Sequence, residues 1–229
     1  MKTTVLKLDG IDDFFTQEAY KTLRTNLQFC GADVRVIALT SCNENEGKST
    51  ISLNLGKSMA ELGKQVLVID CDMRKSVMAG RNTNTKNPVG LSEILTGMIS
   101  IGDGIYATQY ENLHIIFAGK YPPNPVELLN GKYFAALLRE CRKVYDYVII
   151  DTPPLGLVID AAVIAPLCDG TAIIMADNRV RSKQALEVIN QLKKSDCKIL
   201  GVIRNQVGNT KNRYYRKKDS KKYYTAYGK

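Results

Sequence analysis

Continuous apolar runs alternate along this chain with segments in which apolar residues recur at helical spacing. The runs that predict strands begin near residues 36, 65, 112, 146, 170 and 198. The spacing predicts helices over 16–29, about 50–62, 90–97 and 182–194, and one that follows a turn at 122–125 and continues to about residue 142. Residues 76–90, rich in Asn, Thr and Gly, are predicted to form a loop. Apolar strands separated by helices are typical of an α/β fold in which a mostly parallel sheet has helices on both faces.

Residues 36–56 have the order of features that holds the phosphates of a nucleotide. A β-branched and apolar run breaks into small and polar residues, Gly47-Lys48-Ser49-Thr50 follows, and a helical pattern comes next. In such a strand, loop and helix, the loop amides and the helix N-terminus point at the anion. The lysine adds a charge, and the serine offers a hydroxyl to magnesium. The sequence therefore predicts a P-loop NTPase fold, with nucleotide-binding residues Asn45, Glu46, Gly47, Lys48, Ser49 and Thr50.

Carboxylates follow two further apolar strands. Asp70 and Asp72 end the run that begins near residue 65, and Asp151 ends the run that begins near residue 146. Parallel sheets bind ligands at the carboxyl ends of their strands, so the three loops converge at one edge. A single aspartate at a strand end often caps a turn, but three beside a phosphate loop indicate phosphoryl transfer. We assign Ser49, Asp72 and Asp151 to magnesium and Asp70 to the base that accepts the nucleophile's proton; with Lys48 these aspartates form the predicted catalytic set.

Composition places the chain among globular proteins. Its 229 residues are 45% hydrophobic and 24% charged, which fits one well-buried domain over residues 1–207. No apolar run approaches the roughly 18 residues that span a bilayer, and the first residues lack the apolar core of a signal peptide. We therefore expect a cytoplasmic protein. Its six cysteines form no C-x-x-C pair, so we expect reduced thiols that are mostly buried.

The last segment, residues 208–229, differs from the rest in charge and composition. It contains eight Lys or Arg and one Asp, and so holds +7 of the formal net charge of +9. The segment has few aliphatic residues and no periodicity, which predicts a disordered tail. Tyrosine is not a residue that disorder favours, yet five of the chain's twelve tyrosines lie here: Tyr214, Tyr215, Tyr223, Tyr224 and Tyr227. Composition alone would also permit a non-catalytic arm that binds nucleic acid or an anionic membrane.

The predicted helix at 16–29 has an apolar face and a charged face. Thr16 is the expected N-cap. Glu18, Lys21 and Arg24 fall three residues apart on the charged face, and from spacing alone they form a solvated stripe.

Several of these motifs together resemble one family, the bacterial tyrosine kinases (BY-kinases) of the CpsD and CapB type. Residues 68–74, VIDCDMR, look like the family's Walker A′ motif, and residues 148–154, VIIDTPP, look like its Walker B motif. Residues 18–24 are similar to the E-x-x-R-x-x-R oligomerisation helix, with Lys21 in place of the first arginine. Residues 112–129 and 151–161 and the tyrosine-rich tail also resemble the family.

The resemblance implies a kinase that depends on ATP and Mg²⁺ and phosphorylates the five tail tyrosines of neighbouring subunits. It implies a homo-oligomeric ring, an octamer, when unphosphorylated, with Glu18, Lys21 and Arg24 at its contacts. The partner would be the cytoplasmic segment of a membrane adaptor, which would bring a cytoplasmic protein to the membrane and place it in capsular or exopolysaccharide synthesis and export. Asn205 matches the position that contacts adenine in relatives of this fold. No nucleic-acid partner is expected.

The chain departs from the family pattern at two loops. Glu44 and Asn45 stand where Pro-Gly is common, and Lys75 and Ser76 follow Arg74 where Arg-Pro is usual. Asparagine tolerates the left-handed conformation, so we expect the phosphate loop to keep its shape. Lysine at position 21 weakens the predicted ring, because it cannot contact a carboxylate through two nitrogens as arginine does.

The alternative enzyme class is a partitioning ATPase of the MinD and ParA type. Those proteins carry a signature lysine at the start of the loop, where this chain has Asn43. Iron–sulfur carriers of the same broad fold need a C-x-x-C pair, which the chain lacks. The sequence therefore favours the kinase.

Overall fold

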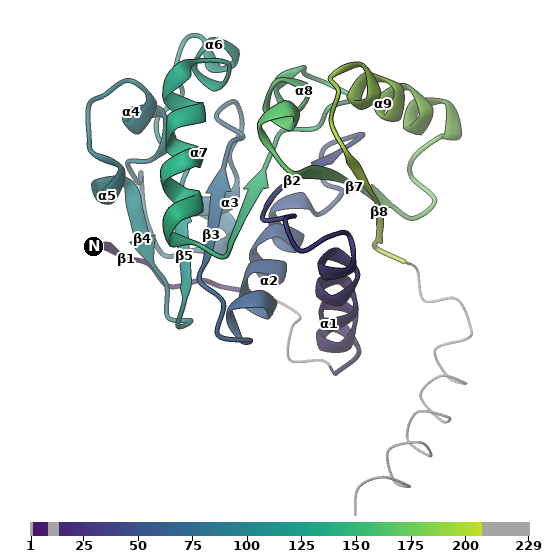
Figure 1. The fold of residues 1–229 in the computed structure, drawn as a ribbon, viewed down its shortest axis with the longest axis horizontal. Coiled ribbons are helices and arrows are strands. Elements are labelled where there is room, and N and C mark those ends of the chain that lie inside the picture. Colours follow the sequence, from purple (N-terminus) through teal and green to yellow (C-terminus); the bar gives the residue numbers. More distant parts are fainter. Residues whose placement is uncertain (1, 9–13, 208–229) are drawn as a thin grey trace, which may run out of the picture.

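A computed structural model describes residues 2–8 and 14–207 of the chain. Within them, one eight-stranded sheet has the order β1-β4-β5-β3-β6-β2-β7-β8 (Figure 1). All neighbouring strands are parallel except β4 and β5. The strands are β1 (Lys2–Thr3), β2 (Val36–Ser41), β3 (Val66–Asp70), β4 (Ile105–Ala107), β5 (Leu113–Ile116), β6 (Tyr147–Asp151), β7 (Gly170–Ala176) and β8 (Ile199–Asn205).

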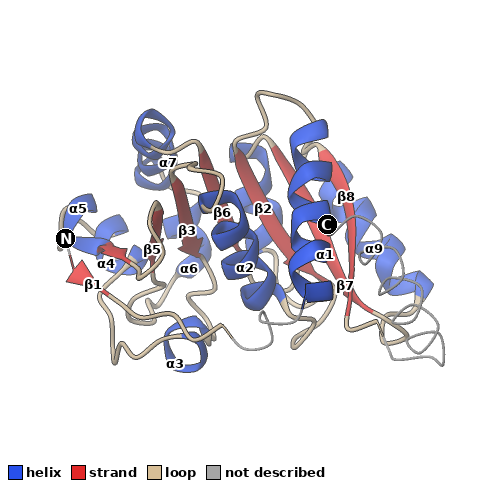
Figure 2. Cartoon of the chain, turned by 90° about the horizontal axis from the view of Figure 1, so that it is seen from below, coloured by secondary structure: helices blue, strands red, loops and turns tan. Residues whose placement is uncertain are grey.

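Helices cover both faces of this sheet, as the apolar strands predict. Along β2, Val36 and Ala38 face one core while Ile37 and Leu39 face the other, because successive side chains of a strand point to opposite faces. Figure 2 views the sheet from the side of α1 and α2. The helices are α1 (Phe14–Phe29), α2 (Lys48–Ala60), α3 (Met78–Asn82), α4 (Leu91–Leu95), α5 (Ile101–Gly104), α6 (Pro125–Leu129), α7 (Lys132–Val144), α8 (Asp160–Ile164), the 3₁₀ turn η1 (Ala165–Leu167) and α9 (Ser182–Lys194).

The expected elements are present, with three corrections. The predicted loop at 76–90 contains α3, and the helix predicted after the Pro-rich turn is two helices, α6 and α7, with Gly131 preceding the second. Thr16 lies inside α1 and is not its N-cap. The short strands β1 and β4 were not predicted, because two or three residues are too few to show a periodicity. The tail prediction falls on residues 208–229, outside the described residues.

The order β3-β6-β2 in the middle of the sheet positions the predicted site. Asp70, the last residue of β3, pairs in register with Asp151, the last residue of β6. On its other side β6 pairs with β2, and Leu39 lies opposite Asp151. The two carboxylate motifs and the phosphate loop therefore leave neighbouring strands at one edge, the carboxyl edge of the sheet, as the sequence predicted.

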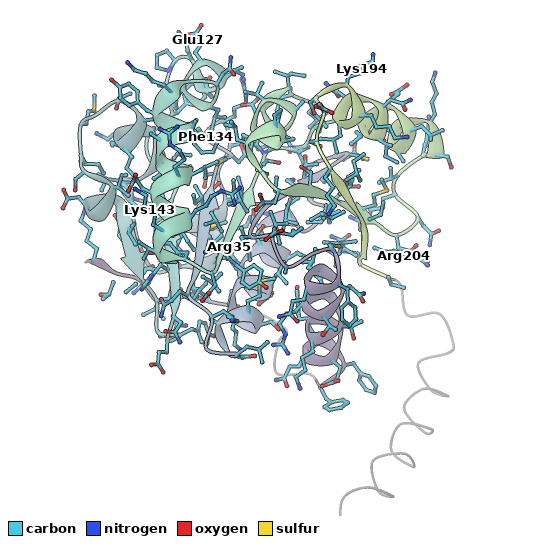
Figure 3. The ribbon with its side chains drawn as sticks, viewed as in Figure 1. Arg35, Glu127, Phe134, Lys143, Lys194 and Arg204 are labelled. Atoms are coloured by element: carbon cyan, nitrogen blue, oxygen red, sulfur yellow. The ribbon has the colours of Figure 1, made fainter. Side chains whose placement is uncertain are left out.

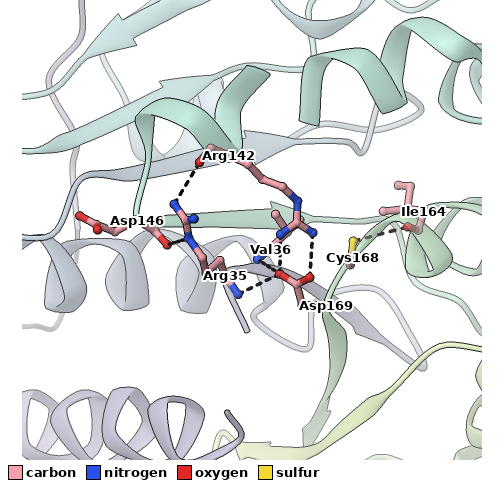
Figure 4. A network of polar contacts seen from close by, with 7 residues as sticks. All are labelled: Arg35, Val36, Arg142, Asp146, Ile164, Cys168 and Asp169. Carbon is pink, nitrogen blue, oxygen red and sulfur yellow. Dashed lines mark hydrogen bonds and ion pairs between the residues drawn. The ribbon is translucent and has the colours of Figure 1, made fainter. Parts of the chain in front are cut away.

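The opposite edge, where the strands begin, is held by a network of charged groups (Figure 4). The Asp169 carboxylate accepts hydrogen bonds from the backbone N–H of Arg35 at 2.9 Å and of Val36 at 2.7 Å, and from both terminal nitrogens of Arg142 at 2.9 and 2.8 Å. The Arg35 guanidinium donates to the backbone carbonyls of Arg142, Tyr145 and Asp146. This network, here named the amino-edge clamp, ties the end of α7 to the starts of β2 and β7.

Candidate nucleotide-binding site

The phosphate loop connects β2 to α2, and a buried glutamate braces it from inside. The Glu46 carboxylate accepts hydrogen bonds from the backbone N–H of Cys42 at 2.8 Å and of Asn43 at 2.9 Å. Glu46 itself is 2% exposed, so only its backbone can face a ligand. Asn45 has φ of 59°, which confirms that asparagine supports the left-handed turn at this position.

The end of β8 supports the same loop from outside. The Asn205 side-chain amide donates to the Glu46 carbonyl at 2.8 Å, and the Gln206 amide donates to the Asn45 carbonyl at 2.9 Å. Gly47 has φ of 91°, and a Cβ there would lie 2.2 Å from the Asn205 Nδ2. Only glycine fits beside this amide. The adenine contact predicted for Asn205 stays a prediction; what the structure adds is a role for this side chain in holding the loop.

Asp151 lies directly behind the phosphate loop. It is 1% exposed and accepts hydrogen bonds from the hydroxyls of Ser49 and Ser52, the second at 3.2 Å. Burial raises the pKa of Asp151 to about 6, although the Ser49 hydrogen bond and the charge of Lys48 act in the opposite direction. Asp151 is thus a buried carboxylate whose charge is incompletely neutralised and which is hydrogen-bonded to the serine of the phosphate loop. This arrangement is expected next to a bound magnesium ion.

Asp70 is enclosed in the same way on the neighbouring strand. Its carboxyl accepts a hydrogen bond from the Ser76 hydroxyl at 2.5 Å and one from the backbone N–H of Asp72 at 3.1 Å. Burial, together with the charge of Asp151, raises the pKa of Asp70 well above its ordinary value. Both oxygens of this carboxyl are therefore engaged within the loop that follows β3.

Asp72 is the predicted carboxylate that lines the cavity. It accepts a hydrogen bond from the backbone N–H of Lys75 at 3.0 Å, and burial raises its pKa. Asp70 and Asp151 lie behind the cavity wall and do not line it. The prediction that these three residues meet at one edge of the sheet is confirmed. Their different access to the cavity comes from the path of the loop at 71–77.

The cavity has a volume of about 370 Å³ and two kinds of wall. Four cationic side chains line it, Lys48 from the phosphate loop and Arg74, Lys75 and Arg81 from the segment after β3. The end of the Walker B-like motif and the residues just after it supply an apolar wall, made of Pro153, Pro154, Leu157 and Val158. Sequence reasoning did not assign these lining residues: Glu44, Arg74, Lys75, Val77, Arg81, Asn82, Pro153, Pro154, Leu157, Val158 and Gln206.

The signals that could have identified them differ. Arg74 belongs to the Walker A′-like motif, and its side chain forms an ion pair with the fully buried Asp160 at 2.9 Å. That arginine could have been included from the motif alone. Arg81 lies on α3, inside a segment predicted to be a loop, so no spacing pointed it at the cavity.

The charged stripe predicted on α1 is present at Glu18 and Lys21 but not at Arg24. Lys21 and Glu18 form an exposed ion pair at 2.7 Å, as spacing predicts. Arg24 instead turns towards α2 and donates hydrogen bonds to the carbonyl and the hydroxyl of Ser58. The expectation that all three side chains share a solvated face is therefore wrong for Arg24, because α1 packs against α2 at this point. The oligomerisation role of the three residues stays a prediction.

The residues present fit a nucleotide with a bound Mg²⁺. The thirteen-residue helix α2 begins at Lys48, so its first N–H groups and this lysine are available to phosphate. The described residues hold no cluster of three or more His, Cys, Asp or Glu suited to a metal. A Mg²⁺ held partly by phosphates needs only one or two carboxylates, which Asp151 and Asp72 can supply. The six cysteines are free thiols, as expected.

Comparisons with known proteins agree on one family. The family model described as "AAA domain" matches residues 34–199. The chain is 40% identical over 212 residues to the tyrosine-protein kinase CpsD of Streptococcus agalactiae, a match that covers 90% of this chain and 93% of that protein.

Solved structures agree with this match. The kinase domain of the Escherichia coli tyrosine kinase ETK has a TM-score of 0.82 at 29% identity and covers 89% of this chain and 81% of its own. The chimerical protein CapA2B2 has a TM-score of 0.82 at 28% identity and covers 91% and 95%.

The rival class is more distant. The septum site-determining protein MinD of Pyrococcus horikoshii, solved with Mg-ADP, has a TM-score of 0.64 at 26% identity and covers 77% of this chain and 72% of its own. In the present structure Asn43, at the position of the signature lysine, exchanges hydrogen bonds with the side chain of Gln184. The described helices include none with the length and apolar character of a membrane span.

Proposed function

Since this chain belongs to the family of bacterial tyrosine-protein kinases, we propose that it transfers the γ-phosphoryl group of ATP to tyrosines of its own C-terminal tail. By this autophosphorylation it regulates capsular or exopolysaccharide synthesis and export. The observation that carries the proposal is the meeting of Lys48, the Ser49–Asp151 hydrogen bond and Asp72 around one cavity. The P-loop fold binds nucleotide; ATP and Mg²⁺ as its ligands are part of the proposal.

The phosphate loop binds and orients the polyphosphate. Lys48 and the first N–H groups of α2 stabilise the phosphate oxygens, and the positive φ of Gly47 lets the backbone approach them closely. Bound Mg²⁺ would supply positive charge to the phosphate oxygens, held by Ser49 and Asp151 with Asp72 close by. Phosphoryl transfer is catalysed mainly by this positioning and charge stabilisation.

The acceptor side of the reaction concerns Asp70 and Asp72. A base must come within hydrogen-bond reach of the tyrosine hydroxyl, and Asp72 lines the cavity whereas Asp70 is enclosed. We therefore favour Asp72 as the carboxylate that meets the acceptor, with Asp70 positioning the loop through Ser76 and the N–H of Asp72. The tail tyrosines Tyr214, Tyr215, Tyr223, Tyr224 and Tyr227 are the proposed acceptors.

The same proposal includes the partners. The unphosphorylated chain forms a ring, an octamer, in which each tail enters a neighbouring site, with Glu18, Lys21 and Arg24 at the contacts between subunits. The cytoplasmic segment of a membrane adaptor activates the kinase and holds it at the membrane. The basic tail is a substrate in this scheme, so no nucleic-acid partner is expected.

Phosphotyrosine mapping by mass spectrometry tests the function. Purified protein incubated with ATP and Mg²⁺, with and without a candidate adaptor peptide, is expected to gain several phosphates on residues 208–229. Lys48→Ala is expected to abolish this labelling with its circular dichroism unchanged. Full labelling of the Lys48→Ala protein would refute the site. Salt-dependent nucleic-acid binding with no phosphorylation would support the non-catalytic arm instead.

A further inference from the structure

An ion pair joins the two loops that form the cationic side of the cavity. The Lys75 ammonium lies 2.8 Å from a carboxylate oxygen of Glu44. Glu44 belongs to the phosphate loop and Lys75 to the segment after β3, and both line the cavity. The Lys75 side chain is 69% exposed and the Glu44 side chain 45% exposed, so both can move without disturbing the core.

Glu44 is an unusual residue for a phosphate loop because its negative charge repels a polyphosphate. The Lys75 hydrogen bond and charge, followed by the charge of Lys48, lower the pKa of Glu44, which keeps the carboxylate ionised near neutral pH. A ligand rich in phosphate therefore meets an acid at the rim of its own site. Lys75 is the cation that offsets this acid.

Such a pair is easily exchanged. Exposed ion pairs contribute little to stability because water screens them and both side chains lose freedom. A lysine ammonium on a flexible stem binds phosphate as a point charge. A nucleoside diphosphate or triphosphate carries more negative charge than one carboxylate. The electrostatic attraction on Lys75 therefore becomes stronger when its ammonium moves from Glu44 to a phosphate oxygen within the same cavity.

We propose that Lys75 is a second phosphate-binding lysine, which the Glu44 carboxylate holds at the cavity and which exchanges that carboxylate for the phosphates of the bound nucleotide. The inference rests on the proposed function, because it concerns the same nucleotide site. It gives a role in nucleotide binding to two side chains outside the motif Gly47-Lys48-Ser49-Thr50. Glu44 then acts against nucleotide affinity, and Lys75 acts for it.

A simpler role for Lys75 would be to neutralise Glu44 and never contact phosphate. The two roles differ once Glu44 carries no charge. If Lys75 binds phosphate, it still contributes to nucleotide affinity in the Glu44→Gln background. If Lys75 only neutralises Glu44, its contribution to nucleotide affinity disappears in that background. A double-mutant cycle therefore separates them.

The experiment measures binding of ADP with Mg²⁺, and of adenosine, to full-length protein by titration calorimetry. Lys75→Gln is expected to weaken ADP binding about five-fold, the effect of one partly screened charged hydrogen bond, and to leave adenosine binding unchanged. Glu44→Gln is expected to strengthen ADP binding about two- to five-fold by removing a like charge. Adding Lys75→Gln to Glu44→Gln should again cost about five-fold, and Lys75→Arg should bind like the wild type.

Lys143→Gln is the matched control. Lys143 pairs with Glu140 at 2.7 Å with exposures of 67% and 54%, close to those of the Lys75–Glu44 pair. It lies at the end of α7 (Figure 3) and is not one of the residues that line the cavity. This variant is expected to bind ADP like the wild type, and an equal loss there would mean that general charge, not a contact, explains the result.

Other outcomes overturn the inference in distinguishable ways. If Lys75→Gln has no effect in the Glu44→Gln background, Lys75 only neutralises Glu44. If Lys75→Gln weakens adenosine and ADP equally, its contact is not with phosphate. If Lys48→Ala loses ADP affinity while Lys75→Gln keeps it, the nucleotide site stands and only the second lysine is wrong. Full ADP affinity in Lys48→Ala would overturn both proposals.

Discussion

Aspartates lie at both edges of the sheet, and their pKa values shift in opposite directions at the two edges. At the amino edge, burial would raise the pKa of Asp169, but hydrogen bonds from Arg142 and from the N–H groups of Val36 and Arg35 outweigh it and lower that pKa (Figure 4). At the carboxyl edge, burial raises the pKa values of Asp70 and Asp151, and within residues 2–8 and 14–207 neither has an arginine partner.

This difference separates a structural site from a functional one. The amino-edge clamp satisfies its carboxylate within the fold, so it needs no ligand. The carboxyl edge leaves two neighbouring carboxyls short of positive charge, which is costly in a protein interior. A cation at this edge would relieve that cost, and perturbed carboxyls of this kind are typical of active sites. Substitutions at each edge and the pH dependence of stability test this difference.

The largest expected effect on stability is at the amino edge. Asp169→Ala removes the partner of Arg142 and of two backbone N–H groups, so the free energy of unfolding should fall by about 3 kcal/mol. Urea unfolding measures this. Glu140→Ala, which breaks the exposed pair with Lys143, is the control and should change the value by less than about 0.5 kcal/mol. If both variants lost the same amount, the clamp would have no special role.

The opposite substitution at the carboxyl edge should affect activity more than stability. Asp151→Asn removes a carboxylate proposed to hold Mg²⁺, so tail phosphorylation should slow by at least about 100-fold. The variant should unfold at an equal or higher urea concentration than the wild type at pH 7, because it removes an under-neutralised buried charge. A loss of several kcal/mol on the scale expected for Asp169→Ala would remove the contrast between the edges.

The pH dependence of stability should carry the same sign difference. The folded-state pKa of Asp151 is raised from 3.8 to about 6, so between these values the folded protein binds more protons than the unfolded chain. The contribution of Asp151 to the free energy of unfolding should therefore fall by roughly 1 to 3 kcal/mol as pH rises from about 4 to about 6. Urea unfolding at several pH values should show this fall in the wild type and a smaller one in Asp151→Asn. Equal slopes would assign the proton to another group.

The smallest effect is expected at Ser76. Ser76→Ala removes the hydroxyl that donates to Asp70, so the pKa of Asp70 should rise further and stability at pH 7 should fall by about 1 kcal/mol. The pH at which phosphorylation is half-maximal should move upwards together with the pKa of Asp70. Ser100→Ala, which removes a similar but exposed hydrogen bond to Asp103 at 2.7 Å, is the control. An unchanged pH profile in Ser76→Ala would show that this hydroxyl does not tune the site.

Much of the fold could be predicted because its signals are local. Apolar runs predicted the six longer strands, and Gly47-Lys48-Ser49-Thr50 located the start of α2. The division into α6 and α7 was missed, because an apolar pattern that continues across Gly131 does not reveal a break. Asn45 adopts the left-handed conformation, as expected from the tolerance of asparagine for it at a position where the family commonly has glycine.

The candidate site was predicted in part for the same reason. Asp70, Asp72 and Asp151 follow strands that parallel pairing must bring to one edge, so their convergence was predictable. Which of them lines the cavity was not, because that depends on how residues 71–77 fold back through hydrogen bonds to Asp70. The direction of Arg24 towards Ser58 likewise depends on the packing of α1 against α2.

The strand and helix pattern, the phosphate loop and the charge of the tail follow from contiguous residues, so they could be predicted before the fold was known. The partners of the charged side chains depend on the folded chain. The Asp169 carboxylate meets the backbone N–H of Arg35 from 134 residues away, and the Lys75 ammonium meets the Glu44 carboxylate from 31 residues away. Spacing cannot reveal such pairs, because electrostatic interactions depend on distance in space and on burial, and both are set only when the strands take their order in the sheet.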